Sequence, residues 1–400
     1  MSAPIPSTAS ATIAEREQAH TSGAYAKRSL VWVRGQGCTV YDEAGRAYLD
    51  LTSGQGVALL GHAHPDVAQA VARQAQTLIT CAEAFYNDQR AALYERLSAL
   101  LPPEFGGGRF FLCNSGAEAQ EGALKVARLL TGRANIVAAK RGFHGRTLGA
   151  LGLTWNKDYR EPFMGWTPPV RHISYNDLAS AEAAIDETVC AVVVEPVQGE
   201  GGVYPANPEW LVGLRRLCDE RGALLVMDEI QSGLGRCGRW FAYQMADIVP
   251  DIITLGKGIA GGLPMGAVIW RAALGTIPAG THGSTFGGNP LSCAAACAAL
   301  DALRAADLPA HSARLGAWLL EALRTLKLPT VREVRGLGLI VGLELRDRVT
   351  PVLQALQERG VLALPAGKTV LRLLPPLIIQ QSELERAVDA IREVLHAVCQ

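Results

Sequence analysis

A carboxylate and a lysine stand at matching places near the middle of this chain. Asp228 follows the apolar run at residues 224–227, and Lys257 follows the run at 252–255, so each lies just past a predicted buried strand. A lysine amino group can form a Schiff base with an aldehyde, and a carboxylate can hold a ring nitrogen protonated. The pair therefore suits a pyridine-type cofactor that accepts electrons. Either residue alone is more simply a solvated side chain of a loop, so the rest of the chain has to decide.

The elements that would position these two residues alternate along the chain. Apolar runs at 109–113, 135–139, 190–194, 224–227 and 252–255 predict strands, and residues 118–130, 183–187 and 209–221 predict helices. Short apolar strands separated by helices predict an α/β fold with a mainly parallel sheet that is covered on both faces. In such a sheet, ligands bind beyond the carboxyl ends of the strands.

Each of these five strand ends is followed by groups that can bind a ligand. They are Ser115, Gly116 and Ala117 after the first strand, Phe143 and Arg146 after the second, Glu195 and Glu200 after the third, and Asp228, Gln231 and Lys257 after the last two. The first set opens a helix, and its free backbone N–H groups predict a phosphate site. Five such strand ends favour an enzyme over a binding or structural protein.

Composition excludes several other classes of protein. Lys and Arg together number 38, as do Asp and Glu, so the chain has no excess positive charge for nucleic acid. No apolar run reaches the roughly 18 residues of a membrane helix, and residues 1–11 predict a frayed tail rather than a signal peptide. The nine cysteines form no Cys-x-x-Cys motif, so we expect neither a disulfide framework nor a metal site. A reducing, cytoplasmic location follows as an expectation.

The pattern changes near residue 290 and predicts three parts. Residues 1–55 hold a predicted strand pair at 39–41 and 47–51, which we expect to pack with the C-terminal unit. Residues 56–289 form the predicted large cofactor-binding domain. Residues 290–400 form a smaller α+β domain, with predicted helices at 291–304, 313–326 and 382–398 and predicted strands at 337–345 and 371–374.

Taken together, these motifs resemble those of a known family over almost the whole chain. The sequence resembles the class III (ω-amino acid) aminotransferases of the pyridoxal-phosphate fold type I superfamily, in particular the acetylornithine and carrier-protein-linked lysine branch. The segments that carry the resemblance are residues 114–119, 143–147, 195–202, 228–233, Lys257 and 283–290. The resemblance implies a large domain with a mainly parallel sheet, a smaller α+β domain, and pyridoxal 5′-phosphate as the cofactor.

The resemblance also implies a role for each cofactor-binding residue. Lys257 would hold the cofactor and move the substrate proton, and Asp228 would pair with the pyridinium nitrogen. Gln231 would donate to the phenolic oxygen, and Phe143 would stack on the ring. The phosphate would be bound by Ser115, Gly116 and Ala117 and by Thr285 of the adjacent subunit, which implies a homodimer with shared active sites. Threonine is frequent in the family where this chain has Ala117, and a backbone contact survives that change whereas a hydroxyl contact does not.

Three further residues would handle substrates according to the resemblance. Arg146 would bind a distal carboxylate, and Arg372 would receive the α-carboxylate of glutamate. Glu200 would mask Arg372 while the ω-amine substrate is bound, so the pair would act as a specificity gate. His144 is expected to be a structural or rim residue, because Lys257 already serves as the base, and Glu195, which precedes a proline at a strand end, is expected to position a loop.

We therefore expect an aminotransferase that moves the terminal amino group of a carrier-protein-linked lysine to or from 2-oxoglutarate/glutamate, in lysine biosynthesis. Acetylornithine aminotransferase of arginine biosynthesis is the close alternative, and one enzyme could do both. Other class III ω-amino acid aminotransferases, or an aminomutase or decarboxylase, are more remote. A small acidic carrier protein would be attracted by basic residues, for which the candidates are Arg133, Lys140, Arg141, Lys157, Arg160 and Arg171.

Overall fold

The computed structural model describes residues 12–397, so the predicted tail at 1–11 and the last three residues lie outside it. The strands are β1 (Trp32–Gln36), β2 (Thr39–Asp42), β3 (Ala47–Asp50), β4 (Arg109–Cys113), β5 (Asn135–Ala139), β6 (Val170–Ile173), β7 (Val189–Val194), β8 (Val197–Gln198), β9 (Tyr204–Pro205), β10 (Leu224–Asp228), β11 (Ile252–Leu255), β12 (Gly266–Trp270), β13 (Val331–Leu337), β14 (Ile340–Leu345), β15 (Val361–Leu362), β16 (Leu364–Ala366) and β17 (Val370–Leu373). The helices are α1 (Ile13–Gln18), α2 (Ser53–Gly56), α3 (Pro65–Ala75), α4 (Asp88–Ser98), α5 (Gly116–Thr131), α6 (Leu148–Leu153), α7 (Lys157–Arg160), α8 (Leu178–Glu182), α9 (Pro208–Arg221), α10 (Pro290–Ala305), α11 (Leu308–Thr325), α12 (Thr350–Glu358) and α13 (Gln381–Ala397).

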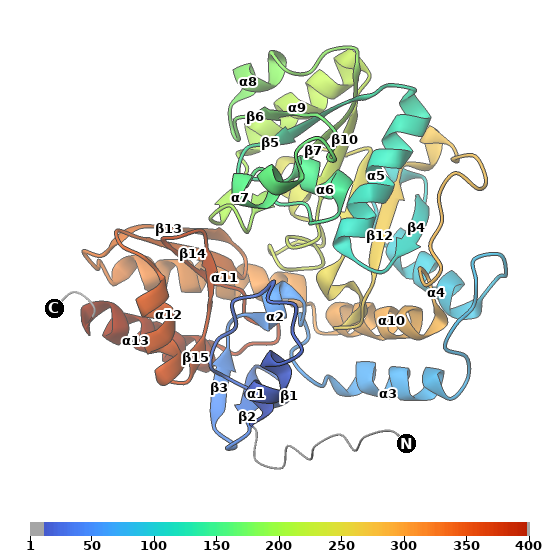
Figure 1. The fold of residues 1–400 in the computed structure, drawn as a ribbon. Coiled ribbons are helices and arrows are strands. Elements are labelled where there is room, and N and C mark those ends of the chain that lie inside the picture. Colours follow the sequence, from blue (N-terminus) through green and yellow to red (C-terminus); the bar gives the residue numbers. More distant parts are fainter. Residues whose placement is uncertain (1–11, 398–400) are drawn as a thin grey trace, which may run out of the picture.

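A seven-stranded sheet forms the centre of the larger part of the molecule (Figure 1). Its strand order is β4-β12-β11-β10-β7-β5-β6, and β12 alone runs antiparallel to both of its neighbours. The predicted mainly parallel α/β fold is therefore confirmed. Because the other six strands share one direction, the carboxyl ends of β4, β5, β7, β10 and β11 meet at one edge of the sheet.

Helices cover both faces of this sheet, and alternate strand residues point to each face. On one face, α5 packs against Val193 and Val226, and on the other, Trp210 and Leu211 of α9 share a core with Val192. All six residues of β7 are buried, as expected for a central parallel strand. The site at the strand ends is thus supported by a rigid, close-packed layer.

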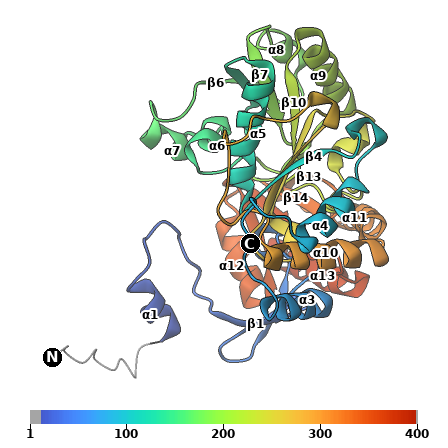
Figure 2. The same ribbon diagram turned by 90° about the vertical axis from the view of Figure 1, so that its right-hand side faces the viewer.

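A smaller part of the molecule is built from segments near both ends of the chain. Strands β13, β14, β17 and β16 form one four-stranded sheet, and β1, β2, β3 and β15 form another. Within the latter, β15 pairs in parallel with β3, so the N-terminal strands extend a unit built mostly from the C-terminal residues. Figures 1 and 2 both show α3 and α10 side by side below the large sheet, and Figure 2 shows α1 standing away from the body.

Two predicted elements differ from the structure. The helix predicted at 183–187 is wrong, since α8 begins after Asp177, whose side chain accepts a hydrogen bond from Ser180 N, and ends at Glu182. The single strand predicted at 337–345 is a hairpin, because Gly338 adopts a left-handed φ of 57° between β13 and β14. Between residues 12 and 397, no helix is long and apolar enough to cross a membrane.

Candidate active site

The strand ends enclose a cavity of about 290 Å³. Its lining includes the predicted site residues Gly116, Ala117, Phe143, Arg146, Glu200, Asp228, Gln231 and Lys257. It also includes His144, Gly145, Glu195 and Ile230. Three predicted residues, Ser115, Thr285 and Arg372, are absent from this lining, and their positions are described below.

Lys257 begins a short 3-10 turn directly after β11 and Gly256. Its φ of 45° lies in the left-handed region, which is uncommon for a residue with a side chain and costs about 1–3 kcal/mol. Burial lowers the pKa of Lys257, while the charges of Glu200 and Asp228 oppose this change in part. Within the described chain, no hydrogen bond or ion pair fixes its amino group. The amine is therefore available for reaction.

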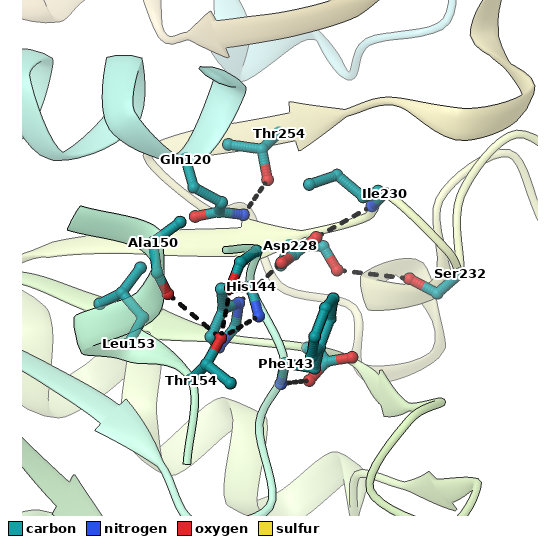
Figure 3. Close-up of polar contacts among 12 residues, drawn as sticks. Gln120, Phe143, His144, Ala150, Leu153, Thr154, Asp228, Ile230, Ser232 and Thr254 are labelled. Carbon is teal, nitrogen blue, oxygen red and sulfur yellow. Dashed lines mark hydrogen bonds and ion pairs between the residues drawn. The ribbon is translucent and has the colours of Figure 1, made fainter. Parts of the chain in front are cut away.

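Asp228 ends β10 and is held from two sides, as Figure 3 shows. One carboxylate oxygen accepts a hydrogen bond from Ile230 N at 3.0 Å, and the other accepts one from Nδ1 of His144 at 2.7 Å. Burial lowers the pKa of His144, but the hydrogen bond with Asp228 and its charge outweigh burial, so the pKa of His144 lies above its ordinary value. The hydroxyl of Thr154 fixes this histidine by accepting its backbone N–H at 3.0 Å.

Glu195 follows β7 and supports the aromatic wall of the cavity. Its carboxylate accepts a hydrogen bond from Phe143 N at 2.9 Å, which fixes the loop that carries the ring. Burial raises the pKa of Glu195 to about 7, although the neighbouring His144 opposes the shift. His144 and Glu195 thus hold Asp228 and Phe143 in position. No local sequence pattern predicts these contacts, since the residues that they join lie far apart in the chain.

Arg372, on β17 in the smaller part of the molecule, contacts two of the residues that line this cavity. Its Nη1 donates to Oε1 of Glu200 at 2.6 Å and to Oε1 of Gln231 at 3.2 Å. Only 1% of its side chain is exposed. Burial alone would raise the pKa of Glu200, but the charge and hydrogen bond of Arg372 outweigh it and lower that pKa. The guanidinium is therefore engaged by a carboxylate, while Gln231 contacts this pair.

The other end of the cavity is the N-terminus of α5. The hydroxyl of Ser115 caps this helix by accepting a hydrogen bond from Glu118 N at 3.1 Å. The N–H groups of Gly116 and Ala117 have no hydrogen-bond partner between residues 12 and 397. A side chain at Gly116 would come within 2.9 Å of Ile230, so only glycine permits this close approach. Free N–H groups at a helix N-terminus favour an anion such as phosphate.

Arg146 and Thr285 are exposed and have different surroundings. The guanidinium of Arg146 lies 3.4 Å from the ring centroid of Tyr159 and 5.8 Å from that of Phe143, at the side of the cavity. Thr285 lies on an exposed loop outside the cavity of its own chain. The neighbouring Ser284 accepts a hydrogen bond from the Asn114 side chain, so this loop begins close to the N-terminus of α5.

These groups fit a phosphorylated pyridine aldehyde. The cavity offers an unpaired amine, a buried carboxylate, an aromatic ring, and two free backbone N–H groups at a helix N-terminus. The described residues hold no cluster of three or more histidine, cysteine, aspartate or glutamate side chains that could bind a metal ion.

Comparison with known proteins agrees with this chemistry. The family model described as aminotransferase class-III matches residues 22–395. The chain is 46% identical to a "[LysW]-aminoadipate semialdehyde transaminase" of Deinococcus radiodurans, covering 96% of this chain and 90% of that protein. It is 43% identical to an acetylornithine aminotransferase of Methanopyrus kandleri, covering 93% and 96%. A crystal structure of ornithine aminotransferase from Toxoplasma gondii, reported with partial occupancy of PLP at the active site, has a TM-score of 0.90 at 35% identity and covers 96% and 93%.

The chain belongs to the class III aminotransferases. It is a transaminase of the fold type I class, and pyridoxal 5′-phosphate is its cofactor. The roles given above to individual residues remain predictions, and the structure contributes the surroundings in which each would act.

Proposed function

We propose that this aminotransferase transfers the terminal amino group of a carrier-protein-linked lysine to 2-oxoglutarate, or the reverse, in lysine biosynthesis. The first half-reaction would leave the amino group on the enzyme, and the second would pass it to the oxo acid. The names of the relatives support both this substrate and acetylornithine, which is the second candidate. One enzyme acting on both substrates fits the same cavity.

The contact between Arg372 and Glu200 carries the proposal. An ω-amine substrate brings no carboxylate next to its reacting carbon, whereas glutamate does. With Glu200 at 2.6 Å, Arg372 is masked and would not attract the wrong carboxylate. When glutamate binds, its α-carboxylate would replace Glu200 on this guanidinium. A dual-substrate enzyme needs such a gate, and a decarboxylase or aminomutase has no need for one.

Arg146 would bind the carboxylate at the far end of either substrate. A bidentate contact from an exposed guanidinium suits this role, and the Tyr159 ring beneath it limits its movement. The terminal amine of the substrate would then point toward Lys257. Arg146, which lines the cavity, and Arg372, which contacts its lining, therefore match the two carboxylates of glutamate.

Lys257 and Asp228 would perform the chemistry. When bound, pyridoxal phosphate supplies an aldehyde and a ring that accepts electrons from the substrate carbon. The lowered pKa of Lys257 increases the neutral fraction of Nζ, which would take the proton from that carbon and deliver it to the aldehyde carbon of the cofactor. Asp228, oriented by its hydrogen bond with His144, would hold a proton on the ring nitrogen. Gln231 would orient the ring by a hydrogen bond, and Phe143 would cover one ring face.

We also propose a cytoplasmic homodimer with shared active sites. Several large apolar side chains are exposed on two neighbouring loops: Leu78, Ile79, Phe85, Tyr86 and Phe286. Arg90 joins these loops through hydrogen bonds to the carbonyls of Cys81, Phe85 and Gly288. Thr285 lies next to Phe286, so a partner that covers this surface would bring Thr285 close to a second cavity. Burial of such a surface favours association.

The structure reduces the number of candidate residues for a basic rim that would attract the acidic carrier from six to four. Arg133 donates to the carbonyls of Val189 and Arg221, and Arg171 pairs with Asp186, so both are engaged elsewhere. The remaining cations are Lys140, Arg141, Lys157 and Arg160. Lys140 and Arg160 lie near the ring of Trp155, and Arg141 and Lys157 line a cavity together with that ring.

Steady-state assays at increasing salt test this proposal. The kcat/KM for carrier-linked lysine should fall steeply as salt rises, because screening weakens the attraction of the acidic carrier, while that for acetylornithine should change little. Charge reversal at Lys157 and Arg160 should harm only the carrier-linked reaction. Equal salt sensitivity for both substrates, or no activity on the carrier-linked one, would favour acetylornithine as the substrate.

A further inference from the structure

A second cavity of about 450 Å³ adjoins the cofactor cavity. Phe143 and Glu200 line both cavities, so the two cavities share these side chains as part of their walls. Tyr159 lines the second cavity and also lies beneath the guanidinium of Arg146. An acyl group on the α-nitrogen of a substrate held by Arg146 would therefore start beside this second cavity.

The second cavity carries two cations that have no ion-pair partner within residues 12–397. Arg141 and Lys157 both line it, and both are exposed to solvent. The guanidinium of Arg141 lies 4.8 Å from the ring centroid of Tyr204, which fixes its plane without neutralising it. The one carboxylate in the lining, that of Glu200, is already paired with Arg372. The cavity is therefore left with an excess of positive charge.

The backbone around Arg141 is held in an unusual conformation. Its φ of 66° lies in the left-handed region, which few residues other than glycine and asparagine adopt. The carbonyl of the preceding Lys140 accepts a hydrogen bond from Gln198 at 2.8 Å. A side chain at Gly201 would come within 2.5 Å of the Arg141 carbonyl, so glycine is needed there for this turn to pack. An arginine kept at a strained, closely packed position indicates a function for its side chain.

We propose that this second cavity is a carboxylate-binding subsite for an acidic acyl group on the α-nitrogen of the amino donor. The inference rests on the proposed function, since it takes Arg146 and Arg372 as the sites of the two glutamate carboxylates and assigns a third carboxylate to Arg141 and Lys157. An acetyl group has no such carboxylate. The subsite therefore distinguishes donors that carry an acidic acyl group from acetylated ones, through a contact made by the donor itself.

Three donors that differ only in the acyl group test this subsite. Nα-glutaryl-lysine offers the carboxylate, its carboxamide analogue has the same length without the charge, and Nα-acetyl-lysine lacks the chain. The holoenzyme should show at least tenfold higher kcat/KM for the glutaryl donor than for the carboxamide at low salt. The preference should shrink at high salt. A wild-type enzyme that does not distinguish the glutaryl donor from its carboxamide overturns the proposal.

Variants of Arg141 and Lys157 test whether these two cations cause the preference for the glutaryl donor. Arg141→Asn keeps a residue that tolerates the left-handed backbone and removes the charge, and Lys157→Gln removes the other charge from an exposed position. Each should reduce the glutaryl preference at least tenfold, and Arg141→Lys should restore part of it. Arg386→Gln, on α13 outside the cavity, is the control for loss of one surface charge. Equal losses for all three donors would assign these residues a merely structural role and overturn the proposal.

A binding measurement with compounds that cannot react tests the subsite independently of turnover. Nα-glutaryl-norleucine and its carboxamide lack the terminal amine, so their affinity for the holoenzyme can be measured by calorimetry without reaction. Tighter binding of the glutaryl compound, lost in Arg141→Asn, supports the subsite even if none of the lysine donors reacts, a result that would count against the proposed donor instead. Equal affinity of the two compounds overturns the subsite while leaving the aminotransferase function intact.

Discussion

Single residues in the cavity act through the groups that hold them. Asp228 is the clearest example, because one of its oxygens is fixed by Ile230 N and the other by His144, whose backbone is fixed in turn by Thr154. A carboxylate held on both oxygens in this way keeps its orientation. The charge of Asp228 and its orientation can therefore be tested separately.

Replacing Asp228 by asparagine should lower kcat at least a hundredfold, or roughly 2.7 kcal/mol of barrier. The amide has nearly the same shape but no charge to keep a ring nitrogen protonated. His144→Gln should lower kcat less, since it leaves the carboxylate in place and alters only its partner. Both variants should move the pH titration of the cofactor absorbance, which is the measurement that separates an electronic effect from misfolding. Turnover of Asp228→Asn within twofold of wild type would show that this carboxylate does not face the ring.

At the residue scale, the sequence predicts which residues are functional better than it predicts which residues contact them. Asp228 and Lys257 could be predicted because each directly follows an apolar strand. The contact between His144 and Asp228 joins residues 84 positions apart, and no spacing rule reports it. The same holds for Glu195 and Phe143, which are brought together only when β5 and β7 pair. Contacts between residues this far apart in the sequence depend on tertiary structure and therefore could not be predicted.

At the scale of elements, the gate depends on how β17 meets the loop after β8. Arg372 comes from the smaller part of the molecule, whereas Glu200 and Gln231 follow strands at the centre of the fold. The ion pair is short and its guanidinium is buried, so removal of the Glu200 charge leaves the charge of Arg372 uncompensated. The gate is thus an interaction between elements. Its two states, with Arg372 paired with Glu200 or released from it, should affect the two half-reactions differently.

Glu200→Gln tests this gate. The substitution keeps the side-chain volume but no longer neutralises Arg372, so carboxylates should compete for the guanidinium at all times. The rate of the ω-amine half-reaction, followed by cofactor absorbance in single turnovers, should fall about tenfold, and the glutamate half-reaction should fall less. Glu333→Gln is the control, because it also removes an arginine partner but lies outside the cavity. Equal losses in both half-reactions would argue against a gate.

The elements themselves were predicted unequally. The strands at 109–113, 135–139 and 252–255 have the predicted bounds, since each is a short, mostly apolar run within the central sheet. Strand β12 was not predicted, because its residues follow Gly261, Gly262 and Pro264, which are typical of a loop. The antiparallel direction of β12 follows from its short connection to β11. An apolar run alone does not predict whether a strand is parallel or antiparallel to its neighbours.

At the scale of the whole molecule, complementation tests the shared active site. Thr285→Ala should weaken cofactor binding if its hydroxyl reaches the phosphate in a neighbouring subunit. Mixing this variant with Lys257→Ala should give heterodimers in which one site has both Lys257 and a partner's Thr285. Those dimers should regain activity when the subunits are unfolded and refolded together, whereas each variant refolded alone should not. Absence of any restored site would show that the threonine acts within its own chain.

Stability should depend on pH through buried carboxyl groups. Glu229 accepts hydrogen bonds from Ser232 and Tyr243 N, yet burial dominates and raises its pKa from 4.5 to about 7. The folded chain then binds more protons than the unfolded one between these two values. The contribution of Glu229 is therefore full below pH 4.5 and is lost as pH rises through 7. Denaturant unfolding of the cofactor-free protein should show a fall in stability over this range.

The variant Glu229→Gln should flatten that pH dependence, because the amide does not titrate. The effect should be on the order of 1–3 kcal/mol between pH 5 and 8. Glu195 has a pKa raised to about 7 as well, so part of the dependence should persist in the variant. A slope identical to that of wild type would show that Glu229 is ionised at every pH tested.

The parallel pairing of β3 with β15 also affects how the protein is made. β3 ends at Asp50 and β15 begins at Val361, so the ribosome must add about 310 residues before the N-terminal strands meet their neighbour. At about 5–20 residues per second, this takes roughly 15–60 s. During translation, the edge of β3 is therefore open to chaperones and to nascent chains on the same messenger RNA. The central sheet has all of its strands by Trp270 and can fold earlier, so translation should produce the cofactor-binding core before the N-terminal sheet is complete.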